Sequence, residues 1–243
     1  MKAIYLNLQR IDGFSGYYKK VQSQIKAFKN HGIDIELVDQ NGLEKKDLSV
    51  SVLSTFKRRK AILKLCEQKI QESNPDFIYV RYPCGDPVYY KFVRKYGHKI
   101  VSEHQTLELN EIKTDGKGIR YFMEKFYGKR ILKKIRGIVA VTEEIANFQR
   151  SRSNRDIPFH IMGNGIEIEK IPFDPKIPSY TDELNLIIVA NINRWHGIDR
   201  LIKGLAAYNG NKKIKFHVVG GGALLEGLKK TSEELNVSDQ VIF

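Results

Sequence analysis

Residues 186–222 read LIIVANINRWHGIDRLIKGLAAYNGNKKIKFHVVGGG and show the alternation of a layered α/β structure. Leu186–Ala190 is a short apolar, partly β-branched run, which is typical of a buried parallel strand. The polar segment Asn191–Gly197 predicts a loop, and apolar residues then recur at helical spacing. Ile214–Val219 predicts a second strand, and Gly220–Gly222 predicts a turn into another helix. Because ligands of open α/β sheets bind outside the carboxyl ends of the strands, the loop and the glycine turn are candidate binding segments.

The rest of the chain repeats this alternation of strands and helices. Apolar runs predict strands at residues 3–8, 33–38, 77–80, 99–102, 137–141 and 158–162. Apolar residues at helical spacing predict helices at residues 21–31, 56–73, 86–96 and 119–135 and from residue 142 onward, whereas residues 41–55 have an irregular, polar pattern. Strands that alternate with helices predict an α/β fold with a parallel, doubly wound sheet.

A change of pattern near residue 163 predicts a domain boundary. Residues 162–166 read MGNGI, a Gly- and Asn-rich sequence that is typical of a turn, and Glu167–Tyr180 holds three of the seven prolines. We therefore expect a Rossmann-like N-terminal domain at residues 1–163 and a linker with a second Rossmann-like domain at residues 164–243. This second domain has two predicted strands and the start of a third, so we expect it to be the first part of a domain that continues past Phe243.

The chain is basic, with 41 Lys and Arg against 28 Asp and Glu and a formal net charge of +13. Such an excess fits an anionic membrane surface, nucleic acid or a phosphorylated substrate. Basic residues cluster at 57–60, 91–95 and 125–136, and aromatic residues lie among the last group. A solvated helix face would explain one cluster, but three with interleaved aromatics favour an anionic membrane surface. No recognised nucleic-acid-binding module is present, so we expect no nucleic acid partner.

Hydrophobic residues make up 42% of the chain, enough for a sizeable core. The two cysteines, Cys66 and Cys84, lack metal-ligand spacing and are expected to be reduced thiols. The start of the chain runs directly into a strand pattern, and no apolar run approaches the roughly 20 residues of a membrane span. We expect a cytoplasmic protein, with any membrane contact peripheral and on the inner face of the cell membrane.

Five segments in order resemble retaining GT-B glycosyltransferases of family 4. They are GFSGYYKKVQSQIKAFKNHGIDIELV, SEHQTLELNE, IVAVTEEIANF, MGNGIEIEKIPF, and VANINRWHGIDRLIKGL with FHVVGGGALLEGL. Each segment is weakly specific alone, but their order and spacing make the set specific. The resemblance implies a GT-B-like fold, with an acceptor-binding N-terminal domain and a C-terminal domain that binds a nucleotide-sugar. It also implies metal-independent chemistry without a cofactor, and no D-x-D metal motif is evident in the cleft segments.

The resemblance implies a donor site with departures from the family pattern. Aligned on Gly197, the donor-phosphate Arg of the family falls on Asn191 and its Lys on His196. We expect Arg194 to supply the cation, or His196 when protonated. The acidic E-x7-E motif of the family is absent from these residues. The proposed donor-binding residues are Gly13, Gly16, Arg194, His196, Gly220, Gly221 and Gly222.

The physical basis for this set is that a leaving diphosphate needs cations and free backbone amides. Arginine offers planar, bidentate donors, and glycine turns at helix starts let amides approach phosphate oxygens. The plainer interpretation of Gly220–Gly222 is a tight strand-to-helix turn, and of Gly13 and Gly16 a flexible surface loop. Trp195 either packs under its loop or faces a sugar or base.

His104 follows the predicted strand at residues 99–102 and resembles the histidine of the family's acceptor domain. This implies a catalytic role for His104 near the acceptor hydroxyl or donor sugar, and acceptor binding for Glu103 and Glu108. The plainer interpretations are a hydrogen-bonded histidine without chemical role and solvated loop carboxylates. The family is thought to retain configuration without a protein nucleophile, so no nucleophile is nominated.

Three hypotheses follow for the whole protein. The first is a glycosyltransferase that moves a sugar from a nucleotide-sugar to a saccharide or lipid-linked acceptor with retention, in cell-surface polysaccharide biosynthesis. The second is a non-catalytic binding module that retains part of a glycosyltransferase. The third is a nucleotide-sugar epimerase of the same fold. The residues present fit all three, and we expect activity to require the missing acidic motif.

Overall fold

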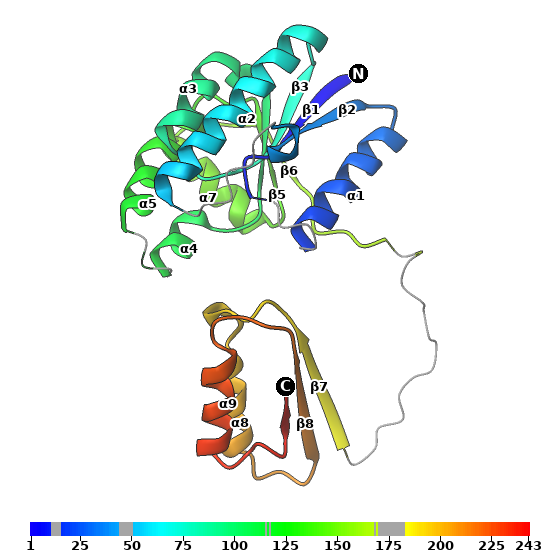
Figure 1. The fold of residues 1–243 in the computed structure, drawn as a ribbon, viewed down its shortest axis with the longest axis vertical. Helices are drawn as coiled ribbons and strands as arrows, with labels where there is room; N and C mark the ends of the chain where they lie inside the picture. The colour runs from blue at the N-terminus through cyan, green and yellow to red at the C-terminus, as the bar shows by residue number, and fades with distance from the viewer. Residues whose placement is uncertain (11–15, 44–50, 115, 117, 168, 170–182) are drawn as a thin grey trace. The chain divides into compact units, whose positions relative to one another are not determined.

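A computed structural model describes residues 1–10, 16–43, 51–114, 116, 118–167, 169 and 183–243 (Figure 1). The chain divides into two compact units, Met1–Ile166 and Glu167–Phe243. The division falls three residues beyond residue 163, the boundary that the turn sequence predicts. Each unit is described by itself below.

The N-terminal unit is built on one six-stranded parallel sheet. Its strands are β1 (Lys2–Leu6), β2 (Asp34–Val38), β3 (Phe77–Arg81), β4 (Ile100–His104), β5 (Gly137–Ala140) and β6 (Phe159–Ile161). They lie in the order β2-β1-β3-β4-β5-β6, and every neighbouring pair is parallel. The chain therefore leaves β1 in one direction for β2 and later returns to its other side for β3, which makes the β1–β3 boundary the switch point of the sheet.

Helices cover both faces of this sheet, as the alternating pattern predicts (Figure 1). They are α1 (Gly16–Asn30), α2 (Val52–Ser73), α3 (Pro87–Tyr96), α4 (Glu108–Thr114), α5 (Gly118–Met123), α6 (Lys129–Leu132) and α7 (Glu143–Ser153), with short 3-10 helices at Gln40–Gly42 and Gly97–Lys99. α1 packs through Val21 and Ile25 against Tyr5 and Tyr79. The opposite face carries the larger core, which buries Ile4 and side chains from α2, α3, α6 and α7.

The helix predicted at residues 119–135 is not one continuous α-helix. A π-helical segment, Glu124–Gly128, separates α5 from α6. At this segment the Glu124 side chain turns inward and is fully buried. Gly128 makes room for it, because a Cβ at Gly128 would collide with the Glu124 carboxylate and the Arg152 guanidinium. A π segment often marks such a local demand of the tertiary structure.

Three other boundaries differ from the sequence-based expectations. β4 continues to His104, two residues beyond its predicted end, so His104 lies in the sheet. α2 begins at Val52 instead of Phe56, because Ser51 caps it through the amide of Ser54. α4 was not predicted, since only Ile112 of its seven residues is an apolar buried side chain.

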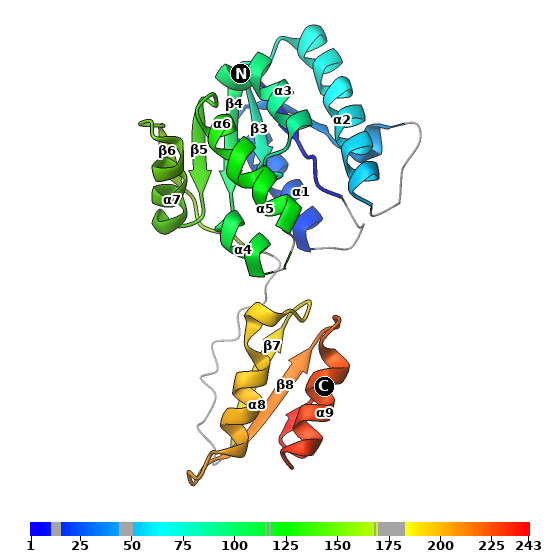
Figure 2. The same ribbon diagram turned by 90° about the vertical axis from the view of Figure 1, so that its left-hand side faces the viewer.

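The C-terminal unit holds a three-stranded parallel sheet in the order β7-β8-β9. Its elements are β7 (Glu183–Val189), a 3-10 helix (Arg194–His196), α8 (Ile198–Ala206), β8 (Lys213–Val219), α9 (Leu225–Glu234) and β9 (Val241–Ile242). α8 and α9 lie side by side over one face of the sheet, where Ile202, Leu205, Phe216 and Val218 form the core (Figure 2). Alternate residues of β7 point away from this core, and Ile187 and Val189 are 69% and 73% exposed.

Candidate functional site

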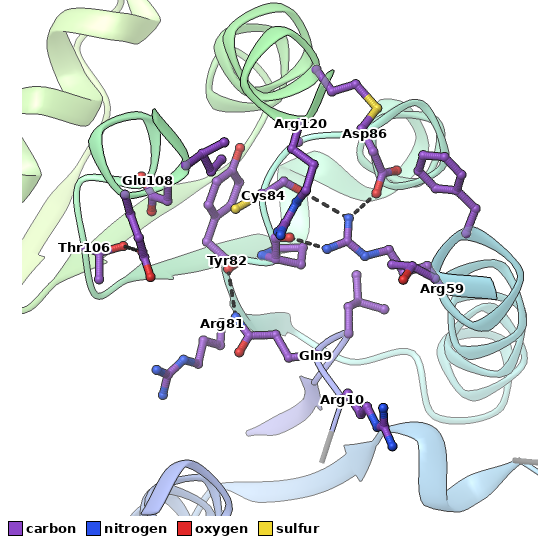
Figure 3. A pocket seen from close by; sticks show the side chains of 18 of the residues that line it. Gln9, Arg10, Arg59, Arg81, Tyr82, Cys84, Asp86, Thr106, Glu108 and Arg120 are labelled. Carbon is purple, nitrogen blue, oxygen red and sulfur yellow. Dashed lines mark hydrogen bonds and ion pairs between the residues drawn. The ribbon is translucent and has the colours of Figure 1, made fainter. Parts of the chain in front are cut away.

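A pocket of about 860 Å³ opens at the switch point of the N-terminal sheet (Figure 3). Its walls come from the segment after β1, the loop after β3, the end of β4 and the start of α5. In open α/β sheets, the strand-end loops diverge at the switch point, which leaves a crevice there. The fold itself therefore accounts for the position of this pocket.

The 81–86 loop after β3 is held in place by Arg59 of α2. The Arg59 guanidinium pairs with the Asp86 carboxylate and donates to the carbonyl oxygens of Pro83 and Cys84, the latter at 3.3 Å. Asp86 in turn caps α3, since its Oδ1 accepts from the Tyr89 amide at 2.8 Å. Arg59 is thus a structural cation, and this wall of the pocket is rigidly built.

Cys84 lies in the same wall with a backbone φ of +66°. Burial, helped by the nearby Glu124 carboxylate, raises the pKa of its thiol to about 12. Burial likewise raises the pKa of Cys66 to about 12. Both thiols stay protonated at neutral pH, so neither is an activated nucleophile.

His104, the predicted catalytic residue, is fully buried at the end of β4. Its Nδ1 lies 2.7 Å from Glu108 Oε1, its Nε2 lies 3.2 Å from the Ser102 hydroxyl, and its ring stacks on Tyr82 with centroids 4.4 Å apart. Both ring nitrogens are therefore engaged within the protein. A catalytic role for His104 stays a prediction, and direct contact with a ligand would require one of these bonds to open.

Glu108 is buried and belongs to an extended polar network. Its Oε2 accepts from Gln149 Nε2 at 2.5 Å, and Arg152 Nη1 lies 3.8 Å away. Burial opposes ionisation of this carboxyl, but His104 and Arg152 outweigh it and hold the pKa of Glu108 below its ordinary value of 4.5. Glu108 is thus not the solvated loop carboxylate of the plainer interpretation, although it borders the pocket.

Glu124 completes this network from the π-helical segment. Its carboxylate accepts from Arg152 Nη2 at 2.5 Å, from the Tyr82 hydroxyl at 3.1 Å and from the Gly85 amide. Burial raises the pKa of Glu124 above its ordinary value of 4.5, and Arg152 opposes this rise. One arginine therefore joins two buried carboxylates, and the network links the pocket loop to His104.

Glu103 is also buried, with 1% of its surface exposed. Its Oε1 accepts from Gln24 at 2.8 Å and from Gln105 at 2.7 Å, and Lys20 lies 3.2 Å away. Within the described residues, its Oε2 has no hydrogen-bond partner. Glu103 borders the pocket, so acceptor binding by its free oxygen remains a prediction.

Arg194 starts the short 3-10 helix in the C-terminal unit and borders a second pocket of about 510 Å³. Asp199 and Arg200 at the start of α8, and Leu224 and Thr231 beside and on α9, also line it. Arg194 and Trp195 are exposed, so Trp195 does not pack under its loop. Among the described residues of this unit, His196 and Gly220–Gly222 do not line this pocket.

His196 follows in the same 3-10 helix and accepts a hydrogen bond at Nδ1 from the Asn193 amide, at 3.0 Å. Nδ1 is the acceptor in this bond, so this ring nitrogen is already engaged in capping the 3-10 helix. Arg194 is therefore the better candidate for the fixed positive charge, which stays a prediction for both residues.

Gly220–Gly222 pack against the loop that follows β7. The Gly221 carbonyl oxygen accepts from the Ile192 amide at 2.7 Å. A Cβ at Gly220 would collide with the carbonyl oxygen of Ala190, and one at Gly222 with that of Ile192. Gly220 and Gly222 also have φ of +137° and +151°, which L side chains rarely adopt. Backbone packing accounts for these two glycines, and donor binding at the turn stays a prediction.

The structure thus brings His104, Glu103 and Glu108 together in one unit, and Arg194, His196 and the glycine turn in the other. Gly16 begins α1 and is exposed, whereas Gly13 lies outside the described residues. Sequence reasoning missed Arg81, although it ends β3 as His104 ends β4 and the same strand-end argument would have found it. Glu124 and Arg152 carried no such signal, because both lie within predicted helices and not at strand ends.

Residues 167–243 match the model of the family glycosyl transferases group 1, and these are the residues of the C-terminal unit. The uncharacterized glycosyltransferase MJ1069 of Methanocaldococcus jannaschii is 35% identical over 120 residues, which cover 46% of this chain and 30% of MJ1069. The chain therefore spans less than a third of this curated relative.

Solved glycosyltransferase structures share the fold of the whole chain. The apo lipopolysaccharide outer core galactosyltransferase WaaB is 19% identical with a TM-score of 0.63, over 100% of this chain and 67% of WaaB. Anabaena HepE in complex with UDP and glucose is 12% identical with a TM-score of 0.60, over 100% of this chain and 68% of HepE. The GT-B-like fold class predicted from the sequence is confirmed. Retention and membership of family 4 are not decided by these similarities.

Among the described residues, no group of three His, Cys, Asp or Glu side chains is arranged to hold a metal ion. None of the described helices is both long enough and apolar enough to cross a membrane.

Proposed function

We propose that the whole protein transfers a sugar from a nucleotide-sugar to a saccharide or lipid-linked acceptor, with retention and without a metal ion. The observation that carries this proposal is Arg194, an exposed guanidinium beside a pocket in the unit that matches the model of glycosyl transferases group 1. A planar guanidinium can donate two hydrogen bonds to a diphosphate and stabilise the negative charge that grows on it as the glycosidic bond breaks.

The donor class and the biological role are supported by two relatives. HepE has been solved in complex with UDP and with UDP-glucose. WaaB is a galactosyltransferase of the lipopolysaccharide outer core. We infer by analogy that this protein takes a nucleotide-sugar and acts in cell-surface polysaccharide biosynthesis, in the cytoplasm. In this proposal the N-terminal pocket receives the acceptor, and Glu103 and the His104 network border its binding site.

A peripheral contact with an anionic membrane surface is part of the same proposal. Ile119, Phe122 and Phe126 are 68%, 69% and 51% exposed on α5 and the π-helical segment that follows. The Arg130 guanidinium stacks over Phe126, with 3.4 Å from its Cζ to the ring centroid. Lys125 and Lys129 lie in the same segment of the chain. Exposed aromatic residues among cations are typical of segments that lie in a lipid interface. Such contact would place the pocket, which Ile119 borders, near a lipid-linked acceptor.

The first experiment is a thermal-shift screen of the full-length protein against UDP-, GDP- and ADP-sugars, followed by calorimetry with the sugar that stabilises it. Arg194→Ala should weaken donor binding about tenfold or more, because it removes a charge-assisted contact. Lys212→Ala, which removes an exposed cation that does not line the pocket, is the matched control. Equal donor affinity in wild type and Arg194→Ala would contradict the assignment of Arg194.

The products distinguish the remaining hypotheses. Transfer to an acceptor supports the proposal, and a product with inverted configuration would contradict retention. Epimerised free nucleotide-sugar without acceptor would show an epimerase. Full-length protein that binds no nucleotide-sugar and transfers none would be a binding module.

A further inference from the structure

Five arginines line the N-terminal pocket, and Arg59 was described above as a structural cation. The five are Arg10, Arg58, Arg59, Arg81 and Arg120. Because isolated cations repel one another and favour anions, such a grouping in a concave site calls for an explanation beyond packing.

The carboxylates of this pocket are already occupied. Asp86 pairs with Arg59, Glu108 Oε2 lies 3.8 Å from Arg152 Nη1, and Glu103 Oε1 lies 3.2 Å from Lys20 Nζ. Glu111 accepts a hydrogen bond from the Thr106 hydroxyl at 2.9 Å. Three of the four acidic residues are thus balanced by cations other than the remaining pocket arginines.

Arg81 and Arg120 stand out within this group. Arg81 ends β3, and its guanidinium lies over the ring of Tyr17 with 4.3 Å to the centroid. Arg120 is exposed on α5 and extends toward the 81–86 loop, across the pocket from Gln9 and Arg10 (Figure 3). Within the described part of the chain, neither forms an ion pair with a carboxylate. Both arginines line the pocket, and no carboxylate of the described residues neutralises either one by an ion pair.

We propose that this pocket binds a phosphoryl group carried by the acceptor, with Arg81 and Arg120 as its ligands. A guanidinium fork matches two phosphate oxygens, and a dianionic phosphate would balance the charge of both arginines. Apolar side chains of Leu8, Ile112 and Ile119 line the same pocket, so the group next to the phosphate has an apolar surface to contact. Naming the ligand as the acceptor rests on the proposed function; the phosphate site itself does not.

A prenyl phosphate and a sugar phosphate share this chemistry, and binding measurements can separate them. Calorimetry on the intact chain would use farnesyl phosphate and glucose 6-phosphate, with glucose as the uncharged probe. Arg81→Gln and Arg120→Gln should each weaken phosphate binding about tenfold. Arg94→Gln is the matched control, because it removes the same charge from an exposed site on α3 outside the pocket. Circular dichroism verifies that each variant is folded.

The outcomes are distinct. Tighter binding of farnesyl phosphate identifies a lipid-linked acceptor as the source of the phosphoryl group, and tighter binding of glucose 6-phosphate identifies a soluble one. Either result supports the site if Arg81→Gln and Arg120→Gln weaken the binding. If Arg94→Gln weakens phosphate binding as much as Arg81→Gln and Arg120→Gln do, the attraction is unspecific and the proposal is overturned. The proposal is also overturned if phosphate binding is lost only in Arg194→Ala, because the phosphate would then occupy the C-terminal unit. Donor binding that survives in Arg81→Gln keeps the proposed function standing even if the phosphate site fails.

Discussion

At the scale of single residues, the most unusual arrangement is one arginine shared by two buried carboxylates with opposite pKa shifts. Arg152 and His104 hold the pKa of Glu108 low, whereas burial leaves the pKa of Glu124 high. A buried pair of this kind contributes little net stability, but removal of one partner leaves a charge that water cannot reach. We expect the network to fix the position of Tyr82 and His104 more than to stabilise the fold.

The two carboxyls should give opposite pH dependences of stability. Glu108, with its pKa lowered in the folded state, stabilises the fold above its ordinary value of 4.5, and this is lost as the pH falls through the lowered pKa. Glu124, with a raised pKa, contributes stability that is present below 4.5 and is lost as the pH rises toward the raised value. Glu108→Gln should therefore reduce the loss of unfolding free energy as the pH falls below 4.5. Glu124→Gln should reduce the loss of unfolding free energy as the pH rises above 4.5.

Urea unfolding of the wild type and both variants, followed by far-UV circular dichroism over acidic to neutral pH, measures these slopes. The two variants act as controls for each other, since each removes one carboxyl and keeps the other. Identical profiles for the two variants would show that the opposite shifts do not exist.

Gly220 offers a second test at residue scale. Gly220→Ala should destabilise the C-terminal unit by about 2 kcal/mol or more, because its φ is positive and the new Cβ would meet the Ala190 carbonyl. Gly221→Ala is a matched control, since a Cβ there has nothing within 4 Å. Fluorescence of Trp195, the single tryptophan, reports on this unit during urea unfolding. Equal midpoints for the two variants would contradict the packing described for the glycine turn.

At the scale of elements, α5 and the π-helical segment carry the proposed membrane contact. Phe122→Ser should weaken binding to phosphatidylglycerol-containing vesicles about tenfold, because a ring of this size contributes roughly 1.5–3 kcal/mol when it leaves water. Leu53→Ser on α2 is the control, since Leu53 is 65% exposed on another helix. Co-sedimentation measures the effect. Binding that is equal to vesicles of phosphatidylcholine alone, or equally reduced by Leu53→Ser, would argue against this segment.

The elements also show what the sequence can and cannot predict. Strands were found because apolar runs such as Leu186–Ala190 have to be buried in a parallel sheet. His104 was found through the family resemblance together with its place at the end of a predicted strand. The π-helical segment was not found, because the burial of Glu124 depends on Gly85 and Arg152, which lie 39 and 28 residues away. Residue patterns report local periodicity, whereas these contacts exist only once the sheet has formed.

At the scale of the whole molecule, the sheets of the two units differ in how they are covered. In the N-terminal unit, Tyr5 and Ile4 point to opposite faces and both are fully buried. In the C-terminal unit, α8 and α9 cover one face of the sheet (Figure 2), while Ile187 and Val189 of β7 are exposed. Parallel sheets ordinarily have both faces covered.

The exposed apolar side chains on β7 should favour self-association of the C-terminal unit. The exposed apolar side chains of Ile187, Val189 and Val219 attract other apolar surfaces in solution, including those of a second copy. At the concentrations used for crystallisation or spectroscopy, we therefore expect these molecules to associate reversibly through β7. A hydrodynamic radius that falls on dilution or in mild detergent would show this association.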